Sequence, residues 1–416
     1  MRNAQIGGTA MIATLVPLFD NEMRVKAYTI LAQRKNFFID SGLIGLGALD
    51  GAQYVAGFDI VDALGIESLS ADAEIFVELS NISIFTDLDE QCHAPHERLV
   101  LLVDDSVEAT DIYVKRLTEL KELGYKLAIQ KLQIKQFEPY RQILSLMDYI
   151  LLNHSRIVID KAKIYFSKVY PKIKLCAVSV DSQEDYDELT KTGGYSLYEG
   201  KFFRVPVDKS ETVVAPLKVN YIHLLNIVNE PDFDLTDAAE VIGRDTALIL
   251  SVLEIANRLT PNAQISSVQH AVAMLGQKEL KRWINTAVTK ELCADRPNEI
   301  TRLSLIRAKF AENMAPYFDI AQLSQELFLM GLFSAIDIML DKPMEEALGM
   351  VQVSDHIRDA LLYKKGVLYP LLYFMQQYEN AAWTEVFRIL VVDNTDMDDI
   401  YHCYLDALTW YRDLFA

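Results

Sequence analysis

The sequence predicts a multidomain chain of two unlike parts, an α/β barrel followed by an all-α bundle. Up to about residue 206, short apolar runs rich in β-branched and aromatic residues recur at nearly even intervals. Beyond that point, apolar residues recur with the spacing of amphipathic helices instead. Between the two parts, residues 206–218 are mainly polar, contain two prolines and show no clear period. We therefore expect domains at residues 1–206 and 207–416.

The first part contains seven apolar runs that we interpret as strands: 11–19, 74–79, 98–103, 125–129, 148–153, 172–178 and a short one near 195–198. From the second run onward they recur about every 25 residues, which is the length of a strand, a helix and two loops. Strands that are apolar throughout and alternate with helices indicate a parallel sheet covered on both faces. Even repetition of that unit predicts a closed (β/α) barrel.

The second part reads as helices. Asp234 is the expected N-cap of the first well-marked helix, and Gly243 is its expected stop. Amphipathic segments follow at 245–257, 266–276, 277–292, 300–317, 324–340, 355–364, 367–378, 381–392 and 397–414.

Composition limits the functions open to this chain. Its 416 residues are 51% hydrophobic and carry a formal net charge of −19, so we expect ordered domains and no nucleic-acid binding. The four cysteines are far apart and form no CxxC pair, which is typical of free thiols in a reducing cytoplasm. No apolar run reaches the roughly 18 residues that a membrane-spanning helix needs. We therefore expect a cytoplasmic protein without membrane insertion.

The stretch ATLVPLFDNEMRVKAYTILAQ, with the scaffold around residues 10–206, resembles the EAL family of cyclic di-GMP phosphodiesterases. The resemblance is strongest to the branch of that family that is fused to an HDOD domain. It implies an EAL-type barrel, in which acidic residues at the carboxyl ends of strands hold two divalent cations. Such chemistry needs oxygen ligands, because hard cations prefer them and both metals must stabilise the reacting oxygens.

The positions that match the family's metal-binding, water-positioning and ligand-contacting residues carry other side chains here. They are Leu15, Val16, Thr29, Gln33, Glu78, Leu102, Gln130, Lys131, Leu151, Val178 and Glu199. Leucine and valine side chains coordinate no metal, and Lys131 places a positive charge where a dication belongs. We therefore predict a degenerate EAL-like barrel with no catalytic residue, no metal, no cofactor and no cyclic di-GMP binding.

Residues 224–284 resemble the HDOD domain more specifically. Its pattern appears in order as Ile242, Asp245 and Leu248, then Leu253, Ala256 and Asn257, then Ile265 through Gly276. By this resemblance, the domain is similar to metal phosphohydrolases that have lost their His-Asp pair. Ser334 and Ala335 stand at that pair in this chain, and only Asp337 nearby offers a metal ligand.

Two clusters in the first part have both a chemical and a structural interpretation. Cys92, His93 and His96 form either a zinc site or a polar connection before a strand. Carboxylates at strand ends form either a repurposed active site or helix caps and a solvated rim. These carboxylates are Glu78, Asp104, Asp105, Asp181 and Glu199. In both cases we favour the structural interpretation.

The sequence thus favours a non-catalytic bacterial signal-transduction protein that acts through protein–protein interaction. We expect a protein partner and place the interaction surface at Asp245, Asn257, Arg258 and Lys281. The aromatic-rich segment 361–387 is either a second partner surface or packed inside the molecule. Two alternatives stay open: a sensor whose barrel binds a nucleotide or other small molecule without hydrolysis, and a barrel enzyme with repurposed carboxylates.

Overall fold

The computed structural model describes residues 11–34, 54–70, 72–204, 216–230, 232–259, 265–293 and 298–415. The chain forms two compact units. One, the barrel unit, combines Met1–Val205 with Tyr373–Ala416, and the other, the helical unit, consists of Pro206–Leu372.

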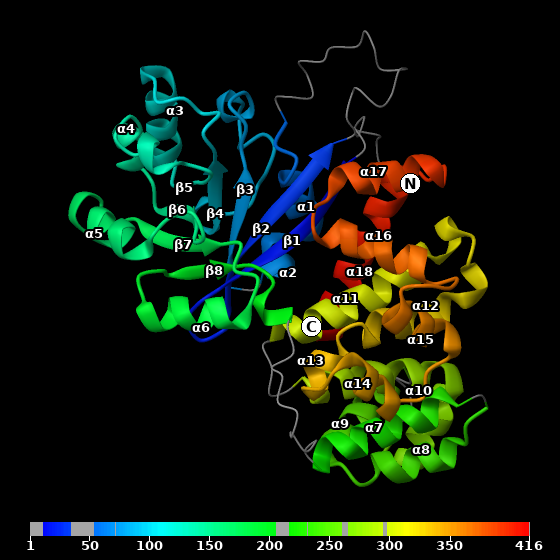
Figure 1. Ribbon diagram of the computed structural model, residues 1–416. Coiled ribbons are helices and arrows are strands. Elements are labelled where there is room, and N and C mark those ends of the chain that lie inside the picture. The colour runs from blue at the N-terminus through cyan, green and yellow to red at the C-terminus, as the bar shows by residue number, and fades with distance from the viewer. Residues whose placement is uncertain are drawn as a thin grey trace. The chain divides into compact units, whose positions relative to one another are not determined.

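Eight strands close the barrel in sequence order (Figure 1). They are β1 (Met11–Phe19), β2 (Val25–Arg34), β3 (Glu74–Glu78), β4 (Leu99–Val103), β5 (Lys126–Ile129), β6 (Tyr149–Asn153), β7 (Lys174–Val178) and β8 (Leu197–Glu199). Neighbours from β2 to β8 pair in parallel, as the rhythm of the sequence predicts. The predicted fold class, a (β/α) barrel followed by helices, is confirmed.

The first two strands depart from the predicted parallel sheet. Strand β1 pairs antiparallel with both β2 and β8. The reason lies in the short connection, because the Asp20 carboxylate accepts hydrogen bonds from the backbone N–H groups of Glu22 and Arg24 and closes a tight turn. A connection of this length makes a hairpin and is too short for a parallel crossover. The sequence pattern had not marked residues 25–34 as a strand.

Helices cover the outside of the barrel between the strands. They are α1 (Phe58–Leu64), α2 (Ile66–Ser70), α3 (Asp111–Glu122), α4 (Arg141–Leu144), α5 (Ile159–Val169) and α6 (Gln183–Thr192). Helix α3 buries Leu117 and Leu120, and the chain turns at Gly124 with φ of 97°. That left-handed conformation favours glycine, so the helix ends before it.

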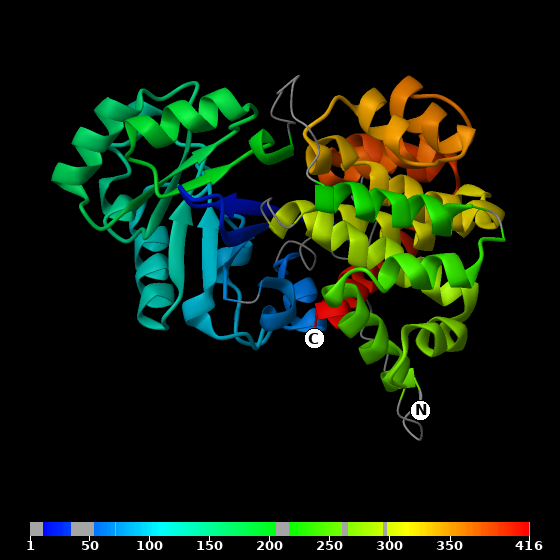
Figure 2. The same cartoon turned by 90° about the horizontal axis from the view of Figure 1, so that it is seen from below.

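The end of the chain returns to the barrel unit. Helix α16 (Tyr369–Glu379) crosses the boundary between the units, and α17 (Trp383–Val392) and α18 (Met397–Phe415) follow it. Helix α18 packs against β1 and against α1 and α2, beside which it lies in Figure 2. The hydroxyl of buried Tyr378 accepts a hydrogen bond from the backbone N–H of Ala13 at 3.4 Å. This division differs from the expected boundaries, which placed all of residues 207–416 in one helical domain.

The helical unit holds nine α-helices among its described residues. They are α7 (Pro216–Asn229), α8 (Leu235–Ile242), α9 (Thr246–Leu259), α10 (Val268–Leu292), α11 (Asn298–Met314), α12 (Ser324–Phe333), α13 (Ile336–Leu340), α14 (Met344–Met350) and α15 (Asp355–Tyr363). Asp234 caps α8 through Thr236 N–H at 2.7 Å, as expected. Helix α10 breaks at Gly276, where φ is 69°, so the two predicted segments meet at that kink. Helix α7 begins at Pro216, inside the stretch expected to be a linker.

The aromatic-rich segment 361–387 is packed rather than displayed for the most part. Leu371, Leu372, Phe374, Met375 and Tyr378 are all buried. Of the two interpretations that the sequence left open, the structure favours packing. Within the described part of the chain, no helix is both long and apolar enough to cross a membrane.

Candidate functional site

The inside of the barrel is filled with apolar side chains. A continuous buried cluster has members on all eight strands. They are Leu18, Ala27, Phe76, Val100, Leu102, Ala128, Tyr149, Leu151, Cys176 and Leu197, with Val178 packed against them. Thr29 is also buried, and its hydroxyl has no hydrogen-bond partner. Thr29, Leu102, Leu151 and Val178 thus belong to, or adjoin, the packed interior.

Polar side chains at the carboxyl ends of β3, β4 and β5 pair with one another. Gln130 donates a hydrogen bond to the Glu78 carboxylate at 2.7 Å, and the Lys131 ammonium lies 2.9 Å from the Asp104 carboxylate. Partial burial works against the charge on Asp104, but hydrogen bonds from Ser106 and Lys131 hold its pKa below the usual value. These groups are therefore committed to contacts within the rim of the barrel.

Glu199, at the end of β8, has a different environment. It lines a cavity of about 220 Å³ together with Asp181, Leu31, Phe203 and Arg204 among others. Burial, followed by the negative charges of Asp181 and Glu78, raises the pKa of Glu199 to about 7. Arg204 lies 3.2 Å from Glu379 of α16, so the returning tail contributes to the wall of this cavity.

A larger cavity of about 650 Å³ opens over the ends of β5, β6 and β7. Leu151 and Val178 form part of its apolar lining, and Lys131, Lys135 and Arg156 are cationic side chains at its wall. Lys131 and Ser179 line it with backbone φ angles of 63° and 62°, in the left-handed region that non-glycine residues rarely adopt. The barrel mouth therefore combines an apolar floor with a polar, partly cationic rim.

This rim does not fit a pair of divalent cations. Such ions need several oxygen ligands directed at a common point, whereas the strand ends present Leu102, Leu151 and Val178, and Lys131 is already paired with Asp104. Within the described ranges, no three His, Cys, Asp or Glu side chains come close enough to hold a metal ion.

The three candidate zinc ligands before β4 point to separate partners. Cys92 is buried, and burial raises the pKa of its thiol. His93 lies 3.4 Å from Asp62, whereas His96 contacts the Leu123 carbonyl at 2.7 Å. His96 also lies 2.9 Å from Asp89. The structural interpretation of this segment accounts for each of these side chains.

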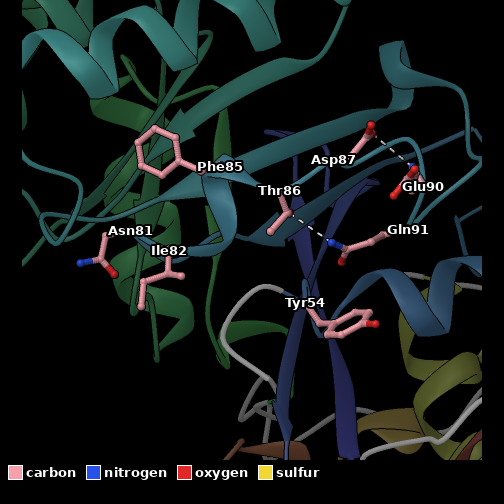
Figure 3. A pocket seen from close by; sticks show the side chains of 8 residues that line it. All are labelled: Tyr54, Asn81, Ile82, Phe85, Thr86, Asp87, Glu90 and Gln91. Carbon is pink, nitrogen blue, oxygen red and sulfur yellow. Dashed lines mark hydrogen bonds between the residues drawn. The ribbon is translucent and has the colours of Figure 1, made fainter. Parts of the chain in front are cut away.

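A third cavity, of about 720 Å³, lies along the segment that follows β3 (Figure 3). Exposed Tyr54, Ile82 and Phe85 give it an apolar surface. Its polar residues are partly engaged with each other, since Gln91 donates to the Thr86 hydroxyl at 3.1 Å. These residues carry no recognisable sequence signal, because scattered apolar residues in a connecting segment have no period.

In the helical unit, two of the four predicted interaction residues are engaged inside the domain. Asp245 caps α9 by accepting hydrogen bonds from the N–H groups of Ala247 and Leu248, and it also accepts one from the Tyr221 hydroxyl at 2.9 Å. The Asn257 amide donates to the Ile265 carbonyl at 2.9 Å and accepts from the Ile265 N–H at 2.7 Å. Both side chains hold the ends of α9 in place.

The other two residues face outward in different settings. Arg258 is exposed and forms an ion pair with Glu254 at 2.8 Å, one turn earlier on α9. Lys281 is half-buried on α10 and lines a small cleft with Lys278, Arg282 and Asn285. Burial lowers the pKa of Lys281.

Ser334 and Asp337 occupy the region where the resemblance places the lost His-Asp pair. The Ser334 hydroxyl donates to the Gly331 carbonyl at 2.6 Å and accepts from Arg307 at 3.0 Å. Asp337 is largely enclosed, and that burial raises its pKa. Through these two hydrogen bonds, Ser334 links α11 to the end of α12.

Comparisons with known proteins agree with the two-part organisation. Residues 214–353 match the family model of the HDOD domain, so the helical unit contains an HDOD domain. Over 413 residues the chain is 27% identical to the uncharacterized protein YuxH of Bacillus subtilis, covering 96% of this chain and 97% of that protein. Over 361 residues it is 25% identical to the cyclic di-GMP phosphodiesterase CdgJ of Vibrio cholerae, covering 85% and 82% respectively.

Solved structures of EAL proteins also resemble the chain at low identity. The Klebsiella pneumoniae BlrP1 complex with manganese and cyclic di-GMP is 15% identical with a TM-score of 0.38, covering 48% of this chain and 57% of that one. The EAL domain of Mycobacterium smegmatis DcpA is 18% identical with a TM-score of 0.33, covering 46% and 90%. The chain thus spans less than two thirds of the BlrP1 chain.

Proposed function

We propose that this protein takes part in cyclic di-GMP signalling through contacts with other proteins and does not hydrolyse cyclic di-GMP. The observation that carries the proposal is the apolar packing of Leu102 and Leu151 inside the barrel. By the resemblance stated above, Leu102 stands where a phosphodiesterase has a metal-binding glutamate, and Leu151 stands where it has the lysine that helps position the water. The relationship to a cyclic di-GMP phosphodiesterase supports the pathway, and the altered residues support the loss of chemistry.

Hydrolysis of a phosphodiester depends on the charges around it. In-line attack on a phosphodiester develops negative charge on the attacking and leaving oxygens, which two metal ions would stabilise. Here the rim offers Lys131, but its ion pair with Asp104 neutralises it. Glu78 adds negative charge next to where a dianionic ligand would lie, and Glu199 adds more when it is ionised. Both hydrolysis and tight cyclic di-GMP binding are therefore disfavoured.

Hydrolysis is tested by incubating the full-length protein with cyclic di-GMP and Mg²⁺ or Mn²⁺ and separating the products by chromatography. We expect no turnover above a blank without protein. Turnover that survives repurification and disappears in Glu199→Gln would overturn the proposal, because it would assign chemistry to the barrel. If turnover is the same in Glu199→Gln and Glu78→Gln as in the unchanged protein, the protein must be purified again before the activity is ascribed to this chain.

Cyclic di-GMP binding is tested by calorimetry on the same protein. We expect no heat of binding that indicates a dissociation constant of about 10 μM or tighter, which corresponds to roughly −7 kcal/mol. A tighter constant would show that the barrel recognises the nucleotide without the expected contacts.

The HDOD domain is the part that we propose to contact a protein partner. Asp245 and Asn257 support its fold, whereas Arg258 and Lys281 have side chains at the surface. We also propose that the protein is cytoplasmic and has no nucleic-acid partner. The net charge of −19 disfavours binding to polyanions such as nucleic acids.

The cavity of about 650 Å³ favours a second candidate function, that of a ligand sensor. Its volume falls in the range of small-molecule sites, and Arg156 and Lys135 would favour an anionic ligand. The test is a thermal-shift screen with mono- and dinucleotides, with Arg156→Gln as the variant. A stabilising ligand whose effect is lost in Arg156→Gln would establish the sensor, and no response would leave the contact function as the better account.

A further inference from the structure

A small cleft in the helical unit lies between the second half of α10 and α12, with α11 at its side. Its lining residues are Lys278, Lys281, Arg282, Asn285, Glu312, Gln325, Phe328 and Leu329. Lys278, Lys281, Arg282 and Asn285 recur at three- and four-residue intervals, so they share one face of α10 after the kink at Gly276.

Two of the three cations in this cleft have no counter-charge. Arg282 lies 2.7 Å from the Glu312 carboxylate, and Lys309 lies 2.8 Å from the same oxygen. Glu312 is thus already shared between two cations. Among the described residues, Lys278 and Lys281 have no ion-pair or hydrogen-bond partner, although the whole chain carries a net charge of −19.

Asn285 is a second, independent observation that points to a ligand. Only 2% of its surface is exposed, and its side-chain oxygen has no hydrogen-bond partner. Buried polar atoms are nearly always paired in folded proteins, so an unpaired one at the lining of a cleft calls for a donor. Phe328 and Leu329 of α12 supply an apolar surface beside it.

The size of the cleft decides which class of ligand it takes. Its volume is about 70 Å³, whereas sites for drug-sized molecules and cofactors usually have about 300–1,000 Å³. A nucleotide does not fit, but one carboxylate side chain does. A single carboxylate held by two partly solvated ammonium groups binds weakly as a free ion, so further contacts of the same molecule must supply the rest.

We propose that this cleft binds a glutamate or aspartate side chain from an acidic segment of a protein partner. The carboxylate lies between Lys278 and Lys281, an N–H of the segment donates to Asn285, and an adjacent apolar residue packs on Phe328 and Leu329. This inference rests on the proposed function as a contact protein and names the chemistry of the partner.

The test uses full-length protein with its lysines converted to ¹³C-dimethyl-lysine, which keeps their charge. The probe is the capped dipeptide acetyl-Glu-Leu-amide, and its matched control is acetyl-Gln-Leu-amide. Lys281→Arg and Lys278→Arg assign the resonances, while Lys342, paired with Glu346, and Lys365, paired with Asp359, are internal controls in the same spectrum.

We expect the Glu probe to cause saturable shifts of Lys281 and Lys278 in the millimolar range, with little change at Lys342 and Lys365. The Gln probe should bind at least about fivefold more weakly, because charge-assisted hydrogen bonds are roughly twice as strong as neutral ones. Unchanged Lys281 and Lys278 resonances would overturn the inference, as would equal responses to both probes.

Two other results would also overturn it in favour of a different occupant. Sodium acetate that matches the Glu probe in its shifts and affinity would make the cleft a site for free small anions. A self-associated protein whose sedimentation reverts to monomer in Lys281→Met would make it an interface between two copies of this chain. Because the readout is a lysine resonance, turnover found in the hydrolysis assay would count against the proposed function without changing this result.

Discussion

The barrel mouth and the α10–α12 cleft both place lysines beside apolar side chains, yet they use them differently. At the mouth, Lys131 is neutralised by Asp104 at 2.9 Å, and Glu78 accepts a hydrogen bond from Gln130. In the cleft, Lys278 and Lys281 lack a partner among the described residues, and the Asn285 oxygen beside them is unpaired. Charges that are paired stabilise local structure, whereas unpaired charges beside a buried acceptor are available to another molecule. Residue type alone does not make this distinction.

The barrel unit also depends on distant sequence in a way that the cleft does not. Its β1 strand is covered by helices from the end of the chain, whereas the cleft is built from three helices that follow each other between residues 268 and 333. The barrel should therefore be the part that responds most to changes in the tail.

Replacing Tyr378 with alanine should have the largest effect on stability. Tyr378 is fully buried, its hydroxyl accepts from Ala13 N–H, and its ring packs against Trp383 and Tyr404. Removing it leaves a cavity and an unpaired N–H, so we expect a loss of about 3–5 kcal/mol in unfolding free energy. Chemical denaturation followed by circular dichroism measures this loss. The exposed residue Tyr363 serves as control, since Tyr363→Ala should change stability by no more than about 0.5 kcal/mol. Equal effects of the two variants would show that the tail does not support the barrel.

Gly331→Ala tests how closely α11 and α12 approach beside the cleft. A Cβ at Gly331 would lie 2.5 Å from the Arg307 carbonyl oxygen and 2.6 Å from the Ala308 backbone, so the helices must separate. We expect a loss of about 1–3 kcal/mol in unfolding free energy, measured by denaturant titration.

The matched control for this variant is Gly349→Ala in α14, where an added Cβ meets nothing within 4 Å. Alanine favours helix over glycine, so this variant should be unchanged or more stable by up to about 1 kcal/mol. A stable Gly331→Ala protein would mean that α12 is free to move away from α11, and the shape of the cleft would no longer be fixed.

Glu199→Gln tests the half-buried carboxyl group at the barrel mouth through pH. The pKa of Glu199 is raised from 4.5 to about 7 in the folded state, so the folded protein binds the proton more tightly than the unfolded chain does. Its contribution is fully present below about pH 4.5 and is lost as pH rises towards 7, which lowers stability over that window. In Glu199→Gln this decline should shrink by about 1–2 kcal/mol, as measured by thermal or denaturant unfolding at several pH values.

Glu385 offers the control for this pH effect, because a hydrogen bond from Arg388 lowers its pKa instead. Glu385→Gln should leave the decline between pH 4.5 and 7 in place. If stability falls by the same amount between pH 4.5 and 7 in Glu199→Gln, the ionised Glu199 is well solvated and its cavity does not raise its pKa.

The smallest effect on stability, and the sharpest contrast, comes from removing one lysine charge at the barrel mouth and one in the α10–α12 cleft. Lys131→Met breaks the ion pair with Asp104, which is partly exposed, so we expect a loss of about 0.5–1 kcal/mol. Lys281→Met removes a half-buried ammonium group without a partner, so stability should stay within about 0.5 kcal/mol of the wild type or rise slightly. Melting curves of the two variants side by side measure this difference. A larger loss in Lys281→Met than in Lys131→Met would mean that Lys281 supports the fold and is not held for a partner.

Much of the architecture could be predicted from the sequence because it depends on neighbouring residues. The even spacing of apolar runs predicted β3 to β8, Asp234 marked the start of α8, and Gly276 marked the break in α10. The replacement of the family's functional residues by Leu102 and Leu151 could also be read directly, since burial of leucine inside a barrel follows from its hydrophobicity. Periodicity, caps and glycine conformation are all set within a few residues of chain.

Only the tertiary structure decided which polar side chains are engaged in hydrogen bonds within the fold and which unit the C-terminal helices join. The sequence treated Asp245, Asn257, Arg258 and Lys281 alike, but the fold engages the first two in hydrogen bonds and leaves Lys281 at a cleft. The tail returns to the barrel unit through contacts such as that of Tyr378 with Ala13, which are 365 positions apart. No local pattern encodes such a contact, because its free energy arises from burying two distant surfaces together.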